Sequence, residues 1–285
     1  MKGGGQTATS ALHPVEPRWE EPGEVSPEVV RALQAELSLP EVLCALLVRR
    51  DLADPDRAKA FLRPLLSELD AAPPLADLGR ATERILHAVE GGETILVHGD
   101  YDVDGIAGAT LLTRWIRRIG GSAIPFVPHR VRDGYDLGDA GIAAAREAGA
   151  GLIVTVDSGI RAHQAVEDAM TAGLEVIVTD HHTPAETLPP AFAVVNPNRA
   201  DCEYPNKSLC GAGVAYRLCE SLARERGIDS EELYASLDLV ALATIADVVP
   251  LNQENRTLVR YGLKALAQTK LPGLRALMSR AGLDD

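Results

Sequence analysis

Cysteine is scarce in this chain, and its spacing argues against the structures that cysteine usually builds. Cys44, Cys202, Cys210 and Cys219 form no CxxC pair. So few thiols in a chain of 285 residues predict free, reduced cysteines rather than a disulfide framework. The separation of Cys202 and Cys210 does not fit a zinc site, so we expect none there.

Positive charge is also in short supply. Lysine and arginine number 28 against 41 aspartates and glutamates, which gives a net charge of -13. This balance argues against a protein that coats nucleic acid by bulk electrostatic attraction, although it leaves room for a local basic path. Divalent cations bound to an acidic cluster would reverse the sign of the charge there.

Long apolar runs are missing as well. No stretch approaches the roughly 20 consecutive apolar residues that cross a bilayer, so we expect no transmembrane segment and no membrane partner. Residues 1–27 are rich in Gly, Pro, Ser and Glu and lack the apolar core of a signal peptide. We therefore predict a disordered leader on a cytoplasmic protein. The remaining length suits about one or two domains.

Helices are expected to fill residues 28–92. Apolar residues recur at helical spacing from Val29 to Leu37 and continue from Val42 to Val48. A further helix is predicted to start at Asp54-Pro55, and another to span 77–89.

From Thr94 onward, apolar runs alternate with helical stretches. The runs lie at 95–97, 123–127, 152–156 and 176–178, with a short strand expected at 192–195. Near-continuous apolar strands in this order predict an α/β fold, with a mostly parallel sheet covered by helices on both faces. Two more helices are expected at 252–267 and 271–281.

Residues 97–105 place His98 and three alternate carboxylates, Asp100, Asp102 and Asp104, directly behind an apolar strand. Such carboxylates repel one another unless water or cations screen them, so the stretch predicts bound multivalent metal. A helix over 106–119 follows, which places the cluster on a turn at the carboxyl edge of the sheet, where ligands bind in these folds. Simple turn formation and helix capping by Asp are the alternative interpretation.

Carboxylate and imidazole groups also follow two later strands. Asp157 comes after the strand at 152–156, and Asp180-His181-His182 comes after the strand at 175–179. A single Asp in such a place is usually a turn or cap residue. Three strand ends of this kind at one sheet edge instead predict a metal site. On a turn, one of the adjacent histidines can bind metal while the other faces substrate.

Two later helices carry features that bear on this site. The first opens with Gly211-Ala212-Gly213, whose small residues allow either a ligand or a packed neighbouring segment to approach the helix N-terminus closely. The second is predicted to run from Leu233 to Ala246 and to end at Asp247. A carboxylate there opposes the helix dipole, so we expect it to have a cationic partner.

These motifs together resemble those of the DHH phosphoesterase superfamily, and most closely its RecJ-type single-stranded-DNA exonucleases. The matching stretches, in the family's order and separations, are 98–105, 156–160, 179–182, 210–215 and 243–251. The loop at 128–135 is similar to the family's substrate-side loop, and Asp136 stands where that family usually has Gly.

The resemblance implies a two-metal phosphodiesterase that digests single-stranded DNA from the 5′ end with about two Mn²⁺ or Mg²⁺ ions per chain. It implies that His98 and Asp102 hold one ion, that Asp104, His181 and Asp247 hold the other, and that Asp157 bridges them. His182 would meet the scissile phosphate as a charge stabiliser or proton donor, and Asp157 is the other expected catalytic residue. Asp100 and Asp180 would orient ligands. The residues expected to grip substrate are His129, Arg130, Arg199, Gly211 and Gly213.

The same resemblance implies a catalytic core at 93–250, followed at 251–285 by helices that begin the link to a second domain outside this sequence. The chain would then be a catalytic half, either an excised fragment or a naturally short relative. It also implies work in DNA repair and recombination, with a single-strand-binding protein or a helicase as partner.

Other functions stay open on the sequence. One is hydrolysis of short oligonucleotides, cyclic dinucleotides or a small phosphoanhydride, as in other DHH proteins. Another is a metal-poor scaffold of the same fold, against which the intact set of metal-ligand residues argues. A nucleotide-binding module without hydrolysis would call for a glycine-rich dinucleotide or P-loop fingerprint, which the sequence lacks.

Overall fold

The computed structural model describes residues 18, 20, 23–71 and 73–283. Most of the leader predicted at 1–27 lies outside these residues. The chain divides into two compact units, Met1–Lys59 and Ala60–Asp285. The domain limits predicted at 27, 92 and 250 stay predictions.

The first unit is helical, as predicted. Helices α1 (Pro27–Leu37) and α2 (Glu41–Val48) pack against each other. Their buried residues include Leu33 and Leu47. Helix α3 (Pro55–Leu62) begins where the Asp54-Pro55 signal placed it, because the Asp54 carboxylate accepts hydrogen bonds from the next free backbone amides.

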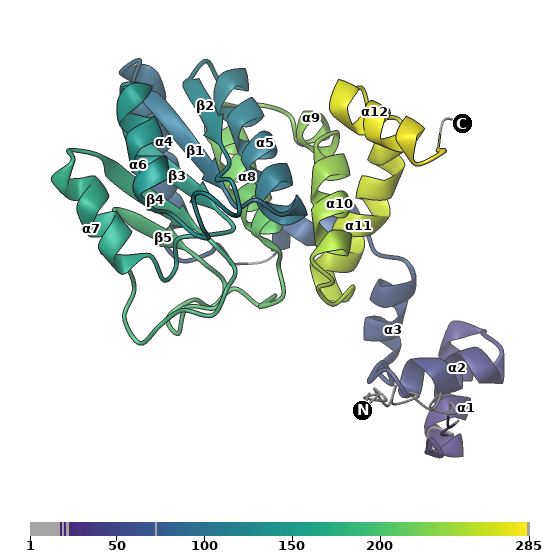
Figure 1. The fold of residues 1–285 in the computed structure, drawn as a ribbon. Coiled ribbons are helices and arrows are strands. Elements are labelled where there is room, and N and C mark those ends of the chain that lie inside the picture. The colour runs from purple at the N-terminus through teal and green to yellow at the C-terminus, as the bar shows by residue number, and fades with distance from the viewer. Residues whose placement is uncertain (1–17, 19, 21–22, 72, 284–285) are drawn as a thin grey trace, which may run out of the picture. The chain divides into compact units, whose positions relative to one another are not determined.

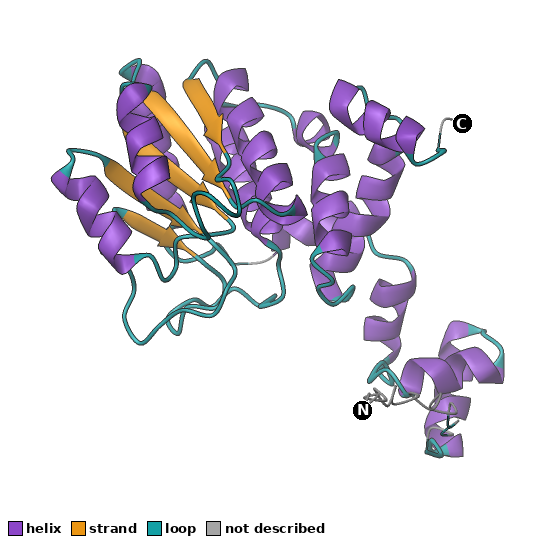
Figure 2. Ribbon diagram, in the orientation of Figure 1, coloured by secondary structure: helices purple, strands orange, loops and turns teal. Residues whose placement is uncertain are grey.

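The second unit is built around a parallel sheet of five strands in the order β2-β1-β3-β4-β5 (Figure 2). The strands are β1 (Thr94–Gly99), β2 (Ser122–Phe126), β3 (Ala150–Val156), β4 (Glu175–Thr179) and β5 (Ala193–Val195). In the central register Val97 lies beside Val154, which lies beside Ile177. Each strand falls on an apolar run in the sequence, so the predicted parallel sheet is confirmed.

Helices cover both faces of this sheet, which confirms the predicted fold class (Figure 1). Helices α4 (Leu78–Glu90), α5 (Val103–Arg118) and α8 (Gly211–Glu225) bury one face, and α6 (Asp139–Glu147) and α7 (His163–Thr171) bury the other. Successive strand residues serve opposite faces: Ile95 and Val97 belong to the first core, and Leu96 belongs to the second.

The helices that follow α8 in the chain correct one prediction. After a 3₁₀ helix at Leu66–Ala71 and the sheet, the chain forms α9 (Ser230–Tyr234), α10 (Leu237–Ala246), α11 (Gln253–Leu266) and α12 (Pro272–Arg280). The continuous helix expected from Leu233 to Ala246 is therefore wrong. The helix breaks at Ser236, whose hydroxyl accepts a hydrogen bond from the Trp115 indole on α5 at 3.0 Å.

The cysteines and the helices bear on two absences expected from the sequence, those of disulfides and of a transmembrane segment. All four cysteines are free and buried, which agrees with unpaired thiols. Among the described residues, no helix combines the length and the apolar character needed to cross a membrane.

The sheet topology marks one place for a ligand. From β1 the chain moves to β2 on one side of it and then to β3 on the other. The connections therefore diverge between β1 and β3, and a crevice outside the carboxyl ends of these strands is where open α/β sheets bind ligands.

Candidate metal centre

Acidic residues line the carboxyl edge of the sheet because three strands end in equivalent ways. Directly after β1, β3 and β4, an aspartate continues the ladder by donating its backbone N–H to the neighbouring strand. These bonds run from Asp100 to Val156 (3.2 Å), from Asp157 to Thr179 (3.0 Å) and from Asp180 to Val195 (3.1 Å). The three carboxylates are thereby held on a fixed backbone.

Three groups of side chains at this edge bring possible metal ligands within 4.8 Å of one another. They are Asp157 with His181 and His182, Asp104 with His181 and Asp247, and Asp100 with Asp102 and Asp157. Five of the six predicted metal ligands thus lie together. His98, the sixth, belongs to none of the groups found in the described part of the chain.

The donor atoms of this edge fit a divalent ion. Several buried atoms here have no hydrogen-bond partner, and they include Asp157 Oδ1, His181 Nε2 and Asp247 Oδ2. Leaving one such atom buried without a hydrogen bond costs about 1–3 kcal/mol, so several of them converging on one point call for a ligand. Carboxylate oxygen with imidazole nitrogen suits Mn²⁺ or Mg²⁺ better than a thiolate-binding ion.

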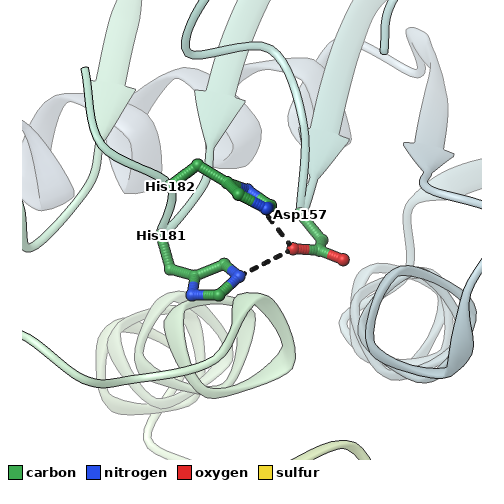
Figure 3. Close-up of side chains that lie close together, drawn as sticks. All are labelled: Asp157, His181 and His182. Carbon is green, nitrogen blue, oxygen red and sulfur yellow. Dashed lines mark ion pairs between the residues drawn. The ribbon is translucent and has the colours of Figure 1, made fainter. Parts of the chain in front are cut away.

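Asp157 stands at the centre of the cluster. Its Oδ1 lies 3.1 Å from His181 Nε2 and 3.8 Å from His182 Nδ1 (Figure 3). Burial, followed by the nearby charges of Asp104 and Asp102, raises the pKa of its carboxyl group to about 10. A cation that binds here must therefore displace a proton at neutral pH.

Both histidines face this carboxylate. Their ring centroids are 4.4 Å apart with planes at 54°. Figure 3 shows that a ring nitrogen of each points toward the Asp157 carboxylate. They differ in their other contacts, because His182 Nδ1 also lies 2.8 Å from Asp180 Oδ1. This hydrogen bond raises the pKa of His182 and favours its protonated form.

Asp180 accepts the hydrogen bond from the His182 ring. Burial would raise the pKa of Asp180, but hydrogen bonds from the His182 side chain and backbone outweigh burial and lower it. Its other oxygen accepts the Ile160 amide at 3.0 Å. The ligand-orienting role predicted for Asp180 stays a prediction, and the carboxylate has the contacts that such a role requires.

His98 is buried at the sheet edge, as are the predicted ligands Asp104 and Asp157. Its ring packs 5.3 Å from the Phe126 ring and directly against Gly141, where a Cβ would lie 2.6 Å from Cδ2. Burial lowers the pKa of His98 to about 4, which keeps the imidazole neutral, the form that can coordinate metal. Nδ1 is buried without a partner. Its predicted role as a ligand stays a prediction.

The α5 start confirms the capping interpretation for one carboxylate. Asp102 is the N-cap, and its Oδ1 accepts the Gly105 amide at 3.0 Å. Its second oxygen is left for another partner, so capping and metal binding do not exclude each other.

The N-terminus of helix α8 packs directly against Asp104 and Asp157, and the small residues there permit this close contact. The backbone amides of Gly211 and Ala212 donate to the two oxygens of Asp104 at 2.5 and 2.7 Å. A Cβ on Gly211 would lie 2.5 Å from Asp157 Cβ. The tight-packing interpretation is confirmed, and the helix N-terminus holds a carboxylate of the protein itself. The substrate-gripping roles predicted for Gly211 and Gly213 stay predictions.

Replacing Gly211 by Ala is expected to lower cleavage by about 10-fold or more and stability by about 1–3 kcal/mol, because the added methyl group pushes Asp157 off its position. Gly79→Ala in α4 is the control, since no heavy atom lies within 4 Å of the position its Cβ would take. The measurements are single-turnover cleavage and thermal melting. Equal behaviour of the two variants would contradict this account.

Asp247 follows the last turn of α10 and faces the same cluster. The basic group beside it is the imidazole of His181, whose Nε2 is 3.8 Å from Oδ2. The cationic partner expected for Asp247 stays a prediction. The next residue, Val248, is 84% exposed and has a φ of 58°, a conformation that a β-branched residue rarely adopts. Strain of this kind is concentrated at functional sites.

The predicted substrate-binding residues fall into different surroundings. Arg130 is exposed and lies 4.9 Å above the Tyr101 ring. His129 uses Nδ1 to accept the backbone amides of Val131 and Arg132. Arg199 is only 8% exposed, and its guanidinium is bound to Asp77, Asp201 and the Val194 carbonyl. Its predicted grip on phosphate stays a prediction, and these contacts do not favour it.

Two residues at the site were given no role in the sequence analysis. Tyr101 stands within the acidic cluster, but a tyrosine between carboxylates has no distinctive spacing. Asp136 was noted only for replacing a usual Gly. Its φ of 72° explains that preference, because Asp is among the few residues that tolerate the left-handed region.

Comparisons with known proteins agree with the architecture. Residues 94–244 match the DHH family, N-terminal domain. The chain is 40% identical over 258 residues to the single-stranded-DNA-specific exonuclease RecJ of Dickeya dadantii, covering 87% of this chain and 44% of the relative. It is 34% identical over 255 residues to the enzyme of the same name from Bacillus subtilis, covering 90% and 32%.

Solved structures give the same result. RecJ of Thermus thermophilus in complex with Mn²⁺ superposes with a TM-score of 0.75 at 33% identity, covering 90% of this chain and 36% of that one. An exonuclease RecJ bound to manganese gives a TM-score of 0.68 at 38% identity, covering 74% and 53%. The chain spans less than half the length of the two curated relatives described above.

Proposed function

Because this chain belongs to the DHH family, we propose that it is the catalytic part of a metal-dependent exonuclease specific for single-stranded DNA, of the RecJ type. The observation that carries the proposal is the convergence, at the sheet edge, of buried atoms of Asp157, His181 and Asp247 that have no hydrogen-bond partner. The names of its relatives supply the substrate class. Digestion from the 5′ end, a cytoplasmic setting and work in DNA repair and recombination are parts of the same proposal, with a single-strand-binding protein or a helicase as partner.

The metal ligands would be those on which the geometry converges. Asp104, His181 and Asp247 would hold one Mn²⁺ or Mg²⁺, Asp102 with His98 would hold the other, and Asp157 would be shared. Ions bound in this way supply Lewis acidity and an activated water for attack on phosphorus. Asp100, whose buried Oδ1 has no hydrogen-bond partner, would orient these ligands.

The protein's own proton chemistry would rest on His182. Its Nδ1 donates to Asp180 at 2.8 Å, which fixes the ring and favours its charged form. The side chain is 45% exposed, so a substrate can reach the ring. His182 would stabilise charge on the scissile phosphate there, or hand its Nε2 proton to the departing 3′ oxygen.

The proposal is tested by incubating the purified chain with Mn²⁺, with Mg²⁺ or with a chelator. Substrates are single strands labelled at either end, duplexes and dinucleotides. Stepwise, metal-dependent loss of nucleotides from one end of the single strand is the expected result. Cleavage of dinucleotides alone would point to a short-substrate enzyme, and no metal-dependent cleavage at all would overturn the proposal. Calorimetry on the same protein should show about two Mn²⁺ bound per chain.

Arg130 is an exposed cation close to this machinery, and Arg130→Ala is expected to weaken single-strand binding several-fold at low salt and less at high salt. Each lost phosphate contact lowers the slope of log affinity against log salt by about 0.7 for a single strand. Fluorescence anisotropy over a salt series measures that slope. Arg114→Ala, at an exposed position of α5, is the control, and an unchanged slope for Arg130→Ala would remove Arg130 from the DNA path.

A further inference from the structure

The loop that carries Arg130 and Tyr135 has internal order. The Asp133 carboxylate accepts the His129 amide at 2.8 Å, and His129 Nδ1 in turn accepts the amides of the two residues that follow Arg130. Gly134 provides a turn with a φ of 87°. A segment folded on itself in this way moves as a unit, so its placement depends on where its ends are attached.

Asp136 provides that attachment. Its φ is 72°, and its Oδ1 accepts the amide of the next residue, Leu137, at 2.9 Å and the amide of Gly159 at 2.5 Å. Gly159 belongs to the turn after β3 that also carries Asp157. Leu137 is buried in the core under α6 and α7. The carboxylate of Asp136 therefore joins the loop by a hydrogen bond to the backbone turn that carries Asp157, a contact that we call the clasp.

The clasp places Tyr135 beside His182. The Tyr135 ring meets the His182 ring edge to face at 6.4 Å and 82°, and it meets the Tyr101 ring at 6.1 Å and 72°. Arg130 continues the series by lying 4.9 Å above Tyr101. These four side chains form a continuous wall that runs away from the cluster. Tyr135 remains 52% exposed, so its ring is available to a ligand.

We infer that Asp136 is a positioning residue, and that Tyr135 with Tyr101, the ring pair it fixes, stacks the base of the terminal nucleotide, which is joined to the rest of the strand through the phosphate that meets His182. The inference rests on the proposed function and names a base subsite within it. Aromatic rings stack every type of base, which suits an enzyme that removes nucleotides one after another. Arg130 at the far end of the wall can pair with the next phosphate.

The test combines variants of the enzyme with variants of the substrate. Wild type, Tyr135→Phe and Tyr135→Ala are compared on single strands whose terminal nucleotide either has its base or is abasic, with the abasic unit placed at the 5′ end or at the 3′ end. For the end that is digested, Tyr135→Ala should raise KM about 5- to 100-fold on the normal strand and leave it nearly unchanged on the abasic strand. Tyr135→Phe keeps the ring and should match wild type. Equal losses on both strands would overturn the inference.

Asp136 is tested by the same substrates. Asp136→Ala and Asp136→Gly both remove the accepting oxygen, so both should reproduce the base-dependent rise in KM, although Gly adopts the backbone conformation freely. Asp136→Asn keeps an accepting oxygen and should restore KM towards wild type. A role confined to folding would instead lower the melting temperature of the protein, and it would lower kcat equally on the normal and the abasic strand.

Binding separates a failure of this inference from a failure of the proposed function. Anisotropy with the same pairs of strands measures the stacking contribution whether or not the chain cleaves them. Tighter binding of the strand that has its terminal base, lost in Tyr135→Ala, supports the subsite even if cleavage is absent. Equal binding of normal and abasic strands by wild type overturns it even if cleavage is present.

Discussion

Asp157→Asn is expected to reduce metal-dependent cleavage by about 10³-fold or more. Asp157 belongs to two of the three ligand groups, so its loss should weaken both proposed ion positions together. Calorimetry should show binding of Mn²⁺ falling in parallel with single-turnover cleavage. Normal Mn²⁺ binding by this variant would contradict a shared ligand.

The same substitution should make the metal-free protein more stable. The pKa of Asp157 is raised in the folded state, so its contribution to stability is fully present below the unfolded pKa of about 4 and is lost as pH rises towards about 10. Asn has no such loss. The melting temperature of metal-free wild type should therefore fall relative to that of the variant as pH rises through this window.

Asp238→Asn is the matched control for both effects. Asp238 is also buried, but its oxygens accept hydrogen bonds from the Leu239 amide and the Thr269 hydroxyl, away from the metal cluster. It should lower stability without changing metal binding. A fall in the stability of metal-free Asp157→Asn similar to that of Asp238→Asn would show that Asp157 does not destabilise the metal-free protein.

His181→Ala and His182→Ala are expected to fail in different ways. His181 Nε2 lies within 3.8 Å of Asp104, Asp157 and Asp247, so its loss should lower Mn²⁺ affinity and cleavage together, and added metal should partly restore turnover. His182 is tied to Asp180, so its loss should leave metal bound while kcat falls by about 10²-fold or more.

Metal stoichiometry measured beside single-turnover cleavage distinguishes the two variants. His87→Ala, at the exposed end of α4, is the control for removing an imidazole. Both rings face Asp157, so either imidazole is close enough to the proposed site to be a metal ligand. Equal loss of metal in both variants would make both imidazoles ligands, and loss in neither would place the metal elsewhere.

The sheet and most of the metal cluster could be predicted because they depend on local sequence. Strands buried on both faces read as apolar runs, and parallel strands bring their carboxyl ends to one edge. Asp104, Asp157 and His181 could therefore be assigned to one place without knowing any contact.

Features that depend on distant partners could not be predicted. At the break, Ser236 accepts a hydrogen bond from Trp115, which lies 121 positions earlier in the sequence. Arg199 was expected at the substrate on the resemblance to the DHH phosphoesterases. Its partner Asp77 lies 122 positions away, and no spacing rule connects them. The clasp by Asp136 also depends on a distant partner, because Gly159 lies 23 positions later, in the turn after β3.

The way α8 holds Asp104 offers a spectroscopic reporter. The Gly211 and Ala212 amides donate to the same carboxylate that is proposed to bind metal, and both are buried. A cation drawing electron density from Asp104 would weaken these bonds, so the two amide resonances should shift on titration with diamagnetic Mg²⁺, and their hydrogen-exchange rates should change with them. Ion loading could then be followed at two backbone positions without any substrate, even in variants that cleave nothing.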